Sequence, residues 1–338
     1  MVADPIPTDS TISMAIQEFF EDLRLSPRSK KTYRIALDKF VVHLRKRFDL
    51  DADRVPVTSL NEDHVTDFVA SLIPDDIRSP EEVSQMRTAQ TNLAAIRKFY
   101  SYLASYDLHP TLSTEKLRNR IAAMMPRFTP PPPDVRTGDL DRIVEFVRNG
   151  ERETDATREL RRLKIKAMTL FLYRTGVRVS ELCGVRRRDI DLASGAAYVY
   201  RAKGGKSRTV HFDSETAEAL VAYWAARGDA GRGIGSLPVF SGRDKTGDPG
   251  SAISPRTVEH IVGELCDLSG VENPITPHSF RHGLATEMVR RRVRESTVQT
   301  ILGHASPTTT RIYVHKVALE VAEEYQDAFG EYRSPSGS

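Results

Sequence analysis

Residues 276–313 read TPHSFRHGLATEMVRRRVRESTVQTILGHASPTTTRIY, and this stretch decides how the rest of the chain is interpreted. Its beginning predicts a helix, because Pro277 suits a first helical position and apolar residues follow at helical spacing. His278 and Arg281 share one face of that helix, since residues three apart are neighbours on a helix surface. Both side chains can then reach the same anion, which indicates a site for a phosphate ester.

The second half of the stretch predicts two further short elements. Apolar residues favour a helix that Gly303 ends, and this leaves His304 in a turn. Ser306 followed by Pro307 is typical of a helix start, so Tyr313 is expected on the helix that this pair begins. A tyrosine hydroxyl is therefore predicted near two histidines and an arginine.

Taken singly, each of these residues is more often structural than catalytic. The joint pattern is more specific: His-x-x-Arg-His, then Leu-Gly-His, then a tyrosine nine residues after that histidine. It resembles the signature of the tyrosine recombinase (phage integrase) family, including its Xer-like site-specific recombinases. The resemblance implies that Tyr313 is the nucleophile and that His278, Arg281 and His304 are catalytic. Phe280 departs from the leucine that many relatives have there.

The resemblance extends to the segment Thr-Gly-Val-Arg-Val-Ser-Glu-Leu, residues 175–182, which looks like the first arginine box of the family. Arg178 is expected at the start of a helix, where free backbone amides and a guanidinium can act together on a phosphate. A surface arginine paired with Glu181 is the plainer interpretation, and both can hold. The resemblance gives Arg178 a catalytic role and Glu181 a supporting one, and His282 is likewise predicted to be supporting.

Residues 196–200 and 209–212 predict two strands of a β-hairpin, because both runs are rich in β-branched and aromatic residues and a Gly-Gly turn separates them. The hairpin tip is basic. Lys203 matches the catalytic hairpin lysine of the family, and Lys206 and Arg208 are predicted to contact DNA. No P-loop spacing is present around Gly204-Gly205, so the sequence does not imply ATP.

The N-terminal residues 1–125 predict an all-helical domain similar to the core-binding domain of the family, with amphipathic helices near residues 12–23, 33–48, 60–72 and 83–103. Lys30, Lys31 and Arg34 on the second helix are predicted to contact DNA. Residues 126–139 contain a run of four prolines and predict a stiff extended linker. A catalytic domain is expected over 140–330, followed by a tail at 331–338.

Within the catalytic domain the patterns predict helices at 140–147 and 163–175, a short strand at 239–241, a helix beginning at Ser254-Pro255, and a last helix through residues 317–329. The predicted fold class is therefore α+β: mainly helical with a small β-hairpin or sheet, in two domains. A helical bundle that clamps DNA would precede a tyrosine-recombinase catalytic domain.

Composition limits the domain number and the classes of protein that fit the sequence. A chain of 338 residues with 39% hydrophobic content can bury a full core in two domains. A net charge of +3 is compatible with nucleic acid without proving it. The two cysteines lie far apart in sequence, and neither a signal pattern nor an apolar run of ~18 residues is present. We therefore expect a cytoplasmic protein without a metal or cofactor.

The resemblance implies metal-free transesterification of double-stranded DNA. Tyr313 would form a covalent 3′-phosphotyrosyl link, and a homo-tetramer on paired recombination sites would exchange strands through a Holliday junction. Three alternatives stay open. A type IB topoisomerase uses similar chemistry on one duplex, and a DNA-binding protein needs only a structural Tyr313. A metal hydrolase would use His278 and His282 as ligands, although the glutamate of His-Glu-x-x-His is missing.

Overall fold

A computed structural model describes residues 10–74, 77, 79–126, 137–200, 207–228, 234–244, 250–303, 313–314 and 317. The chain divides into two units, Met1–Pro130 and Pro131–Ser338, each with its own hydrophobic core. No helix in the described part of the chain is both long and apolar enough to cross a bilayer.

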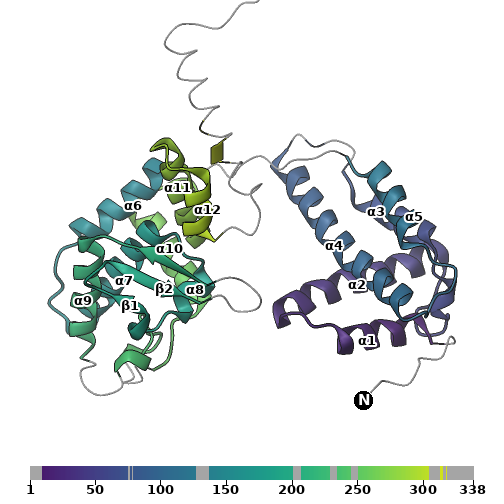
Figure 1. Cartoon of the computed structure of the whole chain (residues 1–338), viewed down its shortest axis with the longest axis horizontal. Coiled ribbons are helices and arrows are strands. Elements are labelled where there is room, and N and C mark those ends of the chain that lie inside the picture. The colour runs from purple at the N-terminus through teal and green to yellow at the C-terminus, as the bar shows by residue number, and fades with distance from the viewer. Residues whose placement is uncertain are drawn as a thin grey trace, which may run out of the picture. The chain divides into compact units, whose positions relative to one another are not determined.

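The first unit is helical throughout its described residues (Figure 1). Its helices are α1 Ile12–Asp22, α2 Pro27–Phe48, α3 Glu62–Leu72, α4 Pro80–Ser105 and α5 Thr114–Met124, with a 3-10 turn at Val57–Ser59. Aromatic side chains fill the core: the ring centroids of Phe19 and Phe99 lie 5.5 Å apart, and those of Phe40 and Phe68 lie 5.3 Å apart. Helix α4 supplies much of this core and contacts α1, α2, α3 and α5.

Capping residues set where the helices of the first unit begin. Ser26 caps α2 and accepts from the backbone N–H of Ser29, and Pro27 occupies the first turn. Ser79 and Glu82 form a reciprocal capping box at the start of α4. These side chains satisfy amide groups that the first turn of a helix leaves without partners.

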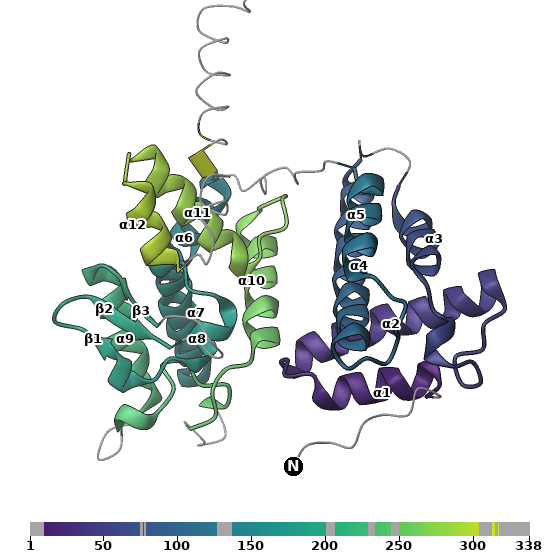
Figure 2. The same cartoon turned by 45° about the vertical axis from the view of Figure 1, so that its right-hand side comes forward.

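The second unit combines helices with one small sheet (Figures 1 and 2). The helices are α6 Thr137–Asn149, α7 Ala156–Thr175, α8 Val179–Gly184, α9 Ser214–Arg227, α10 Pro255–Ser269, α11 Pro277–Arg290 and α12 Glu295–Leu302. The strands are β1 Ile190–Asp191, β2 Ala196–Val199 and β3 Arg208–His211, antiparallel in the order β1-β2-β3, and 3-10 turns lie at Arg187–Asp189 and Ile234–Ser236.

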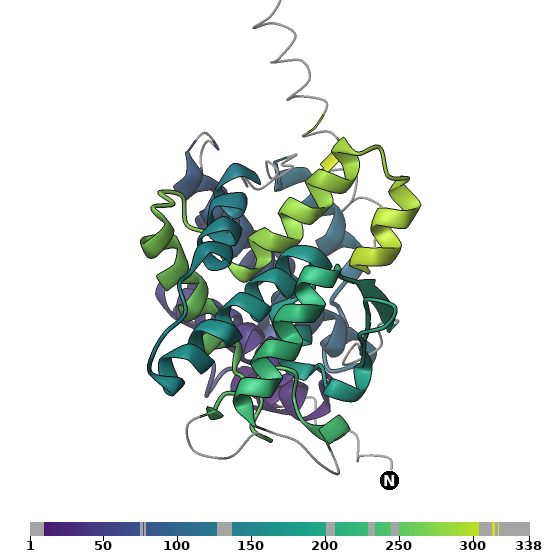
Figure 3. The ribbon, with the colours of Figure 1, turned by 90° about the vertical axis from the view of Figure 1, so that its left-hand side faces the viewer.

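Helix α7 is the centre of this unit. Every residue from 167 to 172 is fully buried, so this part of the helix is covered on all sides rather than along one stripe. Helices α6, α9 and α11 pack against it, and Figure 3 shows α9 and α7 lying side by side. Helix α7 ends at Gly176, whose φ of 57° is left-handed and lets the chain turn directly into α8.

Most of the predicted elements are present. The structure confirms the predicted helix positions α1 to α4, α6, α7, α10, α11 and α12, as well as the hairpin strands β2 and β3. The fold class, mainly helical with a small sheet, is confirmed. The helix predicted to begin at Ser306-Pro307 is described only at Tyr313 and Val314, and the last predicted helix, 317–329, only at Val317; all three residues have helical backbone.

Other details differ from the sequence predictions. Helices α5 and α9 and strand β1 were not predicted, and α6 begins at Thr137, inside the stretch expected to be linker. The predicted strand at 239–241 is absent as a strand: Pro238 and Ser241 each form only an isolated bridge, to Arg186 and Ala252. A short apolar run there is buried without a partner strand long enough to extend the pairing.

We expect Gly176→Ala to lower the free energy of unfolding of the second unit by about 2 to 4 kcal/mol. The new Cβ would adopt a strained positive φ and would also lie 2.9 Å from a methyl group of Leu284 and 3.1 Å from one of Leu302. The measurement is urea denaturation followed by the fluorescence of Trp224, the single tryptophan of the chain, which lies in this unit.

The matched control is Gly228→Ala, because Gly228 ends α9 with a φ of 71° and an added Cβ would meet no atom within 4 Å. It carries the backbone strain without the steric contact, so its cost should be about 1 to 2 kcal/mol. Equal costs for the two substitutions would contradict the importance of packing around Gly176.

Candidate active site

The first two turns of α11 carry three of the predicted site residues. Thr276 caps the helix, with its backbone N–H donating to Ser279 Oγ at 3.0 Å, and Pro277 fixes the first turn. Phe280 is fully buried and anchors the opposite side of the helix. This arrangement presents His278, Arg281 and His282 within one turn of each other.

Arg281 is the deepest of these side chains, only 1% exposed. Its guanidinium donates to the carbonyl oxygen of Gly176 at 3.0 Å and to that of Leu302. These carbonyls lie where α7 and α12 end, and both helices end at a glycine with positive φ, Gly176 and Gly303. The C-terminal end of a helix carries partial negative charge, so the two helix ends form a socket for a buried cation.

Glu181 of α8 lies at the centre of a second group of contacts. Its carboxylate accepts from both terminal nitrogens of Arg208, each at 2.9 Å, and from Arg178 at 3.0 Å. It also accepts from the backbone N–H of Arg178 at 2.8 Å, which caps the first turn of α8. One carboxylate therefore holds two guanidinium groups from separate elements.

The pKa of Glu181 reflects this environment. Burial alone would raise the pKa, but hydrogen bonds from Arg208 and from the backbone of Arg178, together with both guanidinium charges, lower it to about 2. Arg208 also donates from Nε to the carbonyl oxygen of Ile301 at 2.7 Å. The ion pair thus connects strand β3 to α8 and to the end of α12.

The region carries an excess of positive charge. Burial and the neighbouring charges of Arg178 and Arg208 lower the pKa of Arg281 to about 9. Burial, followed by the charges of Arg281 and Arg178, lowers the pKa of His278 below its ordinary value. Three arginines and one glutamate give a formal charge of 3 − 1 = +2 in this group. Such a surplus in a largely buried region is suited to an anion such as a phosphate diester.

Tyr313 is brought to this group from the far end of the sequence. Its side chain is 3% exposed, and its hydroxyl oxygen lies 2.5 Å from Nδ1 of His282. The ring of His278 packs against that of His282, with centroids 4.3 Å apart and planes at 83°. Burial raises the pKa of the Tyr313 hydroxyl to about 12, although the charge of Arg281 works in the other direction.

The structure thus brings together Arg178, Glu181, His278, Arg281, His282 and Tyr313 of the predicted set. Lys203, Lys206 and His304 lie outside the described residues. Lys30, Lys31 and Arg34 belong to α2 of the first unit. The ammonium group of Lys30 donates to the carbonyl oxygen of Phe20 at 2.8 Å, and the guanidinium of Arg34 lies 4.2 Å from the centre of the Phe20 ring.

Arg208 is placed differently from the expectation that it contacts DNA. It is 7% exposed, and its guanidinium is engaged by Glu181 and Ile301. The reason is strand alternation: Arg208 and Val210 face inward on β3, while Thr209 and His211 face outward. The two-residue period of the strand was a signal for this orientation, because Val210 is apolar and shares the face of Arg208.

The alternative of a histidine metal site requires several ligands in one place. Among the residues that the structure describes, no group of three or more histidine, cysteine, aspartate or glutamate side chains has an arrangement that could hold a metal ion. Nδ1 of His282 is instead directed at the hydroxyl of Tyr313.

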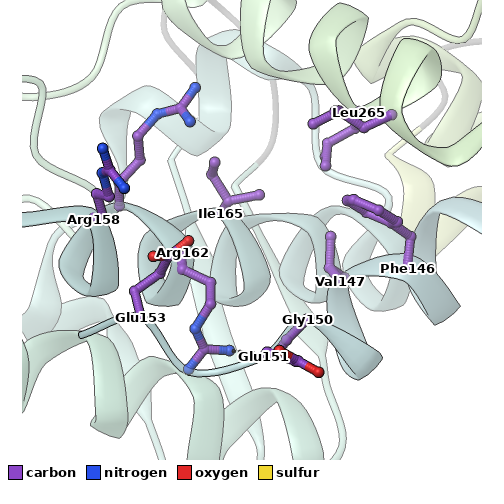
Figure 4. Close-up of a pocket in the computed structure, with 11 residues that line it drawn as sticks. Phe146, Val147, Gly150, Glu151, Glu153, Arg158, Arg162, Ile165 and Leu265 are labelled. Carbon is purple, nitrogen blue, oxygen red and sulfur yellow. Dashed lines mark hydrogen bonds between the residues drawn. The ribbon is translucent and has the colours of Figure 1, made fainter. Parts of the chain in front are cut away.

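A separate cavity of about 520 Å³ lies between α6, the start of α7 and α10 (Figure 4). Phe146, Ile165 and Leu265 contribute its apolar lining, and Arg158 and Arg162 lie at its charged side. Arg162 is paired with Glu159 at 2.7 Å. None of the predicted site residues lines this cavity.

Comparison with known proteins identifies the family of the chain. Residues 136–320 match the model of the phage integrase family. The chain is 34% identical over 242 residues to tyrosine recombinase XerC of Xanthomonas campestris pv. campestris strain B100, an alignment that covers 72% of this chain and 68% of the relative. The chain belongs to the phage integrase family. It is a tyrosine site-specific recombinase, as the sequence pattern predicted.

Other relatives extend the similarity along the whole chain. Tyrosine recombinase XerC of Vibrio parahaemolyticus is 27% identical over 335 residues, which cover 98% of this chain and 97% of the relative. The fold of this chain also resembles that of XerH in a post-cleavage complex with palindromic difH substrate. The TM-score is 0.67 and the identity 18%, and the match covers 94% of this chain and 84% of XerH. A lambda integrase dimer bound to a COC′ core site gives a TM-score of 0.61 and 16% identity, covering 97% of this chain and 81% of that one.

We expect Glu181→Gln to lower the free energy of unfolding at pH 7 by about 3 kcal/mol, because the substitution leaves two guanidinium groups without their shared carboxylate. The pKa of Glu181 falls from 4.5 to about 2 on folding, so its stabilisation is present above pH 4.5 and is lost as the pH falls toward 2. Urea denaturation of both proteins, followed by Trp224 fluorescence, should show the difference shrinking across that pH range.

Glu264→Gln is the matched control, since Glu264 pairs with Arg161 at 2.7 Å but both side chains are substantially exposed. Its cost at pH 7 should stay below about 1 kcal/mol. A difference between Glu181→Gln and the native protein that stays constant down to pH 2 would contradict the role given to the carboxylate charge.

Proposed function

We propose that the chain cuts and rejoins DNA at specific sites, with Tyr313 as the nucleophile. The observation that supports this most directly is the position of a buried tyrosine hydroxyl beside a cluster of two histidines and arginines with surplus positive charge. Solved relatives with the same fold, XerH and lambda integrase, are complexes with DNA substrates.

In the proposed reaction, Tyr313 Oη attacks the phosphorus of one strand and the bond to the 5′-oxygen breaks. Arg178 and Arg281 neutralise the non-bridging oxygens, since a guanidinium stays charged and presents several donors in one plane. The carbonyls of Gly176 and Leu302 engage two of the five N–H donors of Arg281 and fix its plane. Glu181 accepts one hydrogen bond from the guanidinium of Arg178 and so restrains its position.

His278 and His304 are proposed to supply hydrogen bonds or proton transfer at the phosphate, and Lys203 to protonate the departing 5′-oxygen. The product is a 3′-phosphotyrosyl link that retains the energy of the phosphodiester. A 5′-hydroxyl from another strand then attacks this link and restores DNA without ATP. Because the side chains carry the required positive charge, the proposal includes neither a metal nor a cofactor.

Strand exchange between two sites needs two pairs of active subunits. We therefore propose a homo-tetramer on paired sites and a Holliday junction between the two exchanges, acting in the cytoplasm. Lys30, Lys31 and Arg34 of α2 and Lys206 of the hairpin are proposed to contact the DNA backbone, as arginine and lysine commonly do. Arg208 is excluded from that group because it is buried in the ion pair with Glu181.

We expect Tyr313→Phe to bind DNA with near native affinity and to form no covalent adduct, because only the attacking oxygen is removed. Incubation with a DNA fragment carrying a recombination site, followed by denaturing gel electrophoresis, measures the adduct. Tyr106→Phe is the control: this exposed hydroxyl of the first unit donates to Asp22 at 2.8 Å, and its loss should leave adduct formation unchanged. An adduct that persists in Tyr313→Phe would move the nucleophile to another tyrosine, with Tyr325 and Tyr332 next to be tested.

Recombination and DNA relaxation share the same covalent intermediate. We expect the native protein to give recombinant DNA from two sites on separate fragments, measured by the appearance of joined products of new length. Relaxation of a supercoiled plasmid without any recombinant product would favour the topoisomerase alternative. Specific binding without an adduct would favour the DNA-binding alternative.

A further inference from the structure

The contact between His282 and Tyr313 links the α11 cluster to the nucleophile. His282 follows His278 by one helical turn, and its Nδ1 lies 2.5 Å from the hydroxyl oxygen of Tyr313. At this separation the ring nitrogen and the hydroxyl oxygen are in direct contact, as a hydrogen bond requires. A histidine this close can do more than occupy space, because a neutral imidazole carries one basic nitrogen in its plane.

The Tyr313 hydroxyl must lose its proton to act as a nucleophile. Burial raises its pKa to about 12, so the phenolate is the minor form near neutral pH. The attack must therefore remove the proton while the bond to phosphorus forms. A general base within hydrogen-bonding distance of the hydroxyl is the usual way to do so, and it typically contributes a factor of about 10² to 10⁴.

We propose that His282 is the general base that accepts the Tyr313 proton at Nδ1 during DNA cleavage. The inference rests on the proposed function, in which Tyr313 attacks the phosphodiester. It gives a direct chemical role to a residue that the sequence pattern indicated only as supporting.

The proton and electron balance is complete within these groups. The neutral His282 ring holds its proton on Nε2, so Nδ1 accepts the hydrogen bond from Tyr313. As Oη forms its bond to phosphorus, the O–H electron pair stays on oxygen and the proton moves to Nδ1, which makes an imidazolium. The bond between phosphorus and the 5′-oxygen breaks, and that oxygen takes a proton from the general acid. In rejoining, the attacking 5′-hydroxyl gives its proton back to the group that was the general acid, and the Tyr313 oxygen leaves and recovers its proton from Nδ1.

The geometry favours His282 over His278 for this step. The rings of His278 and His282 meet edge to face, with their planes at 83°, and Nδ1 of His282 lies 2.5 Å from the Tyr313 hydroxyl. Burial, with the charges of Arg281 and Arg178, lowers the pKa of His278, which favours the neutral form of that ring and suits it to the phosphate.

Two substitutions separate proton acceptance from positioning. His282→Asn places a neutral amide oxygen near the position of Nδ1, so it can keep the hydrogen bond but cannot take the proton; His282→Ala removes both. We expect both variants to slow single-turnover cleavage of a nicked substrate by about 100-fold, with DNA affinity nearly unchanged. His260→Asn is the matched control, because His260 lies on α10 of the same unit with its side chain 75% exposed.

The decisive experiment replaces Tyr313 with a fluorinated tyrosine. Its phenol ionises close to neutral pH, so its attack needs no general base. We expect this residue to restore most of the lost cleavage rate in His282→Ala and His282→Asn, while changing the native rate little. A residue that only supports the fold cannot be replaced by a more acidic nucleophile. Added imidazole should also raise the rate of His282→Ala, since it supplies the missing base.

Each other outcome overturns the proposal. Native cleavage rates in His282→Asn would show that a hydrogen bond suffices and that no proton is transferred to His282. A slow His282→Ala that fluorination does not rescue would make the residue structural, and rescue of His278→Ala instead would move the base to His278. Adduct formation in Tyr313→Phe would show that another tyrosine is the nucleophile, and this result distinguishes a failure of the proposed role of Tyr313 from a failure of the His282 assignment.

Discussion

The ion pairs of the Glu181 carboxylate hold together the elements around the proposed active site. A buried charge costs several kcal/mol unless partners replace its water, and here Arg178, Arg208 and a backbone amide supply those partners. The same contacts join the start of α8 to strand β3 and, through Arg208 and Ile301, to the end of α12. One acidic side chain thus fixes the spacing between three elements that carry or flank proposed catalytic residues.

Backbone carbonyls, and not Glu181, hold the guanidinium of Arg281. Arg281 receives no side-chain carboxylate among the described contacts; the ends of α7 and α12 hold it instead. Helix ends provide only partial negative charge, so they orient the guanidinium without neutralising it. The surplus charge remains directed toward an incoming phosphate, and a carboxylate in the same place would have cancelled it. Gly176 and Gly303 are necessary to this design because their positive φ turns the last carbonyls of both helices toward the arginine.

Local sequence patterns predicted the helices and residues of this site. They could not predict the contacts between residues that lie far apart in the sequence. Caps and helical spacing located α10, α11 and α12, and the family resemblance marked Arg178, Arg281 and Tyr313. The contact of Arg208 with Glu181 spans 27 residues, and that of Arg281 with Gly176 spans 105, so neither follows from helix or turn rules. Arg208 was expected at the surface because it follows a basic hairpin tip, whereas strand alternation turns it inward. Helix α9 escaped prediction because its polar residues are spread around it and leave a weak apolar stripe, although Asp213 and Gly228 mark its two ends.

The pairing of His282 with Tyr313 has a consequence for how the reaction can be controlled. In the structure the Tyr313 hydroxyl is buried, burial raises its pKa to about 12, and it lies 2.5 Å from Nδ1 of His282, the proposed base. Proton transfer in that state is unfavourable, because it would create an imidazolium beside Arg281 without a new anion to balance it. A phosphodiester placed between the arginines supplies that balance, and the charge that develops on it in the transition state favours a cationic His282. In the proposed mechanism, activation of Tyr313 therefore depends on a phosphate bound between the arginines.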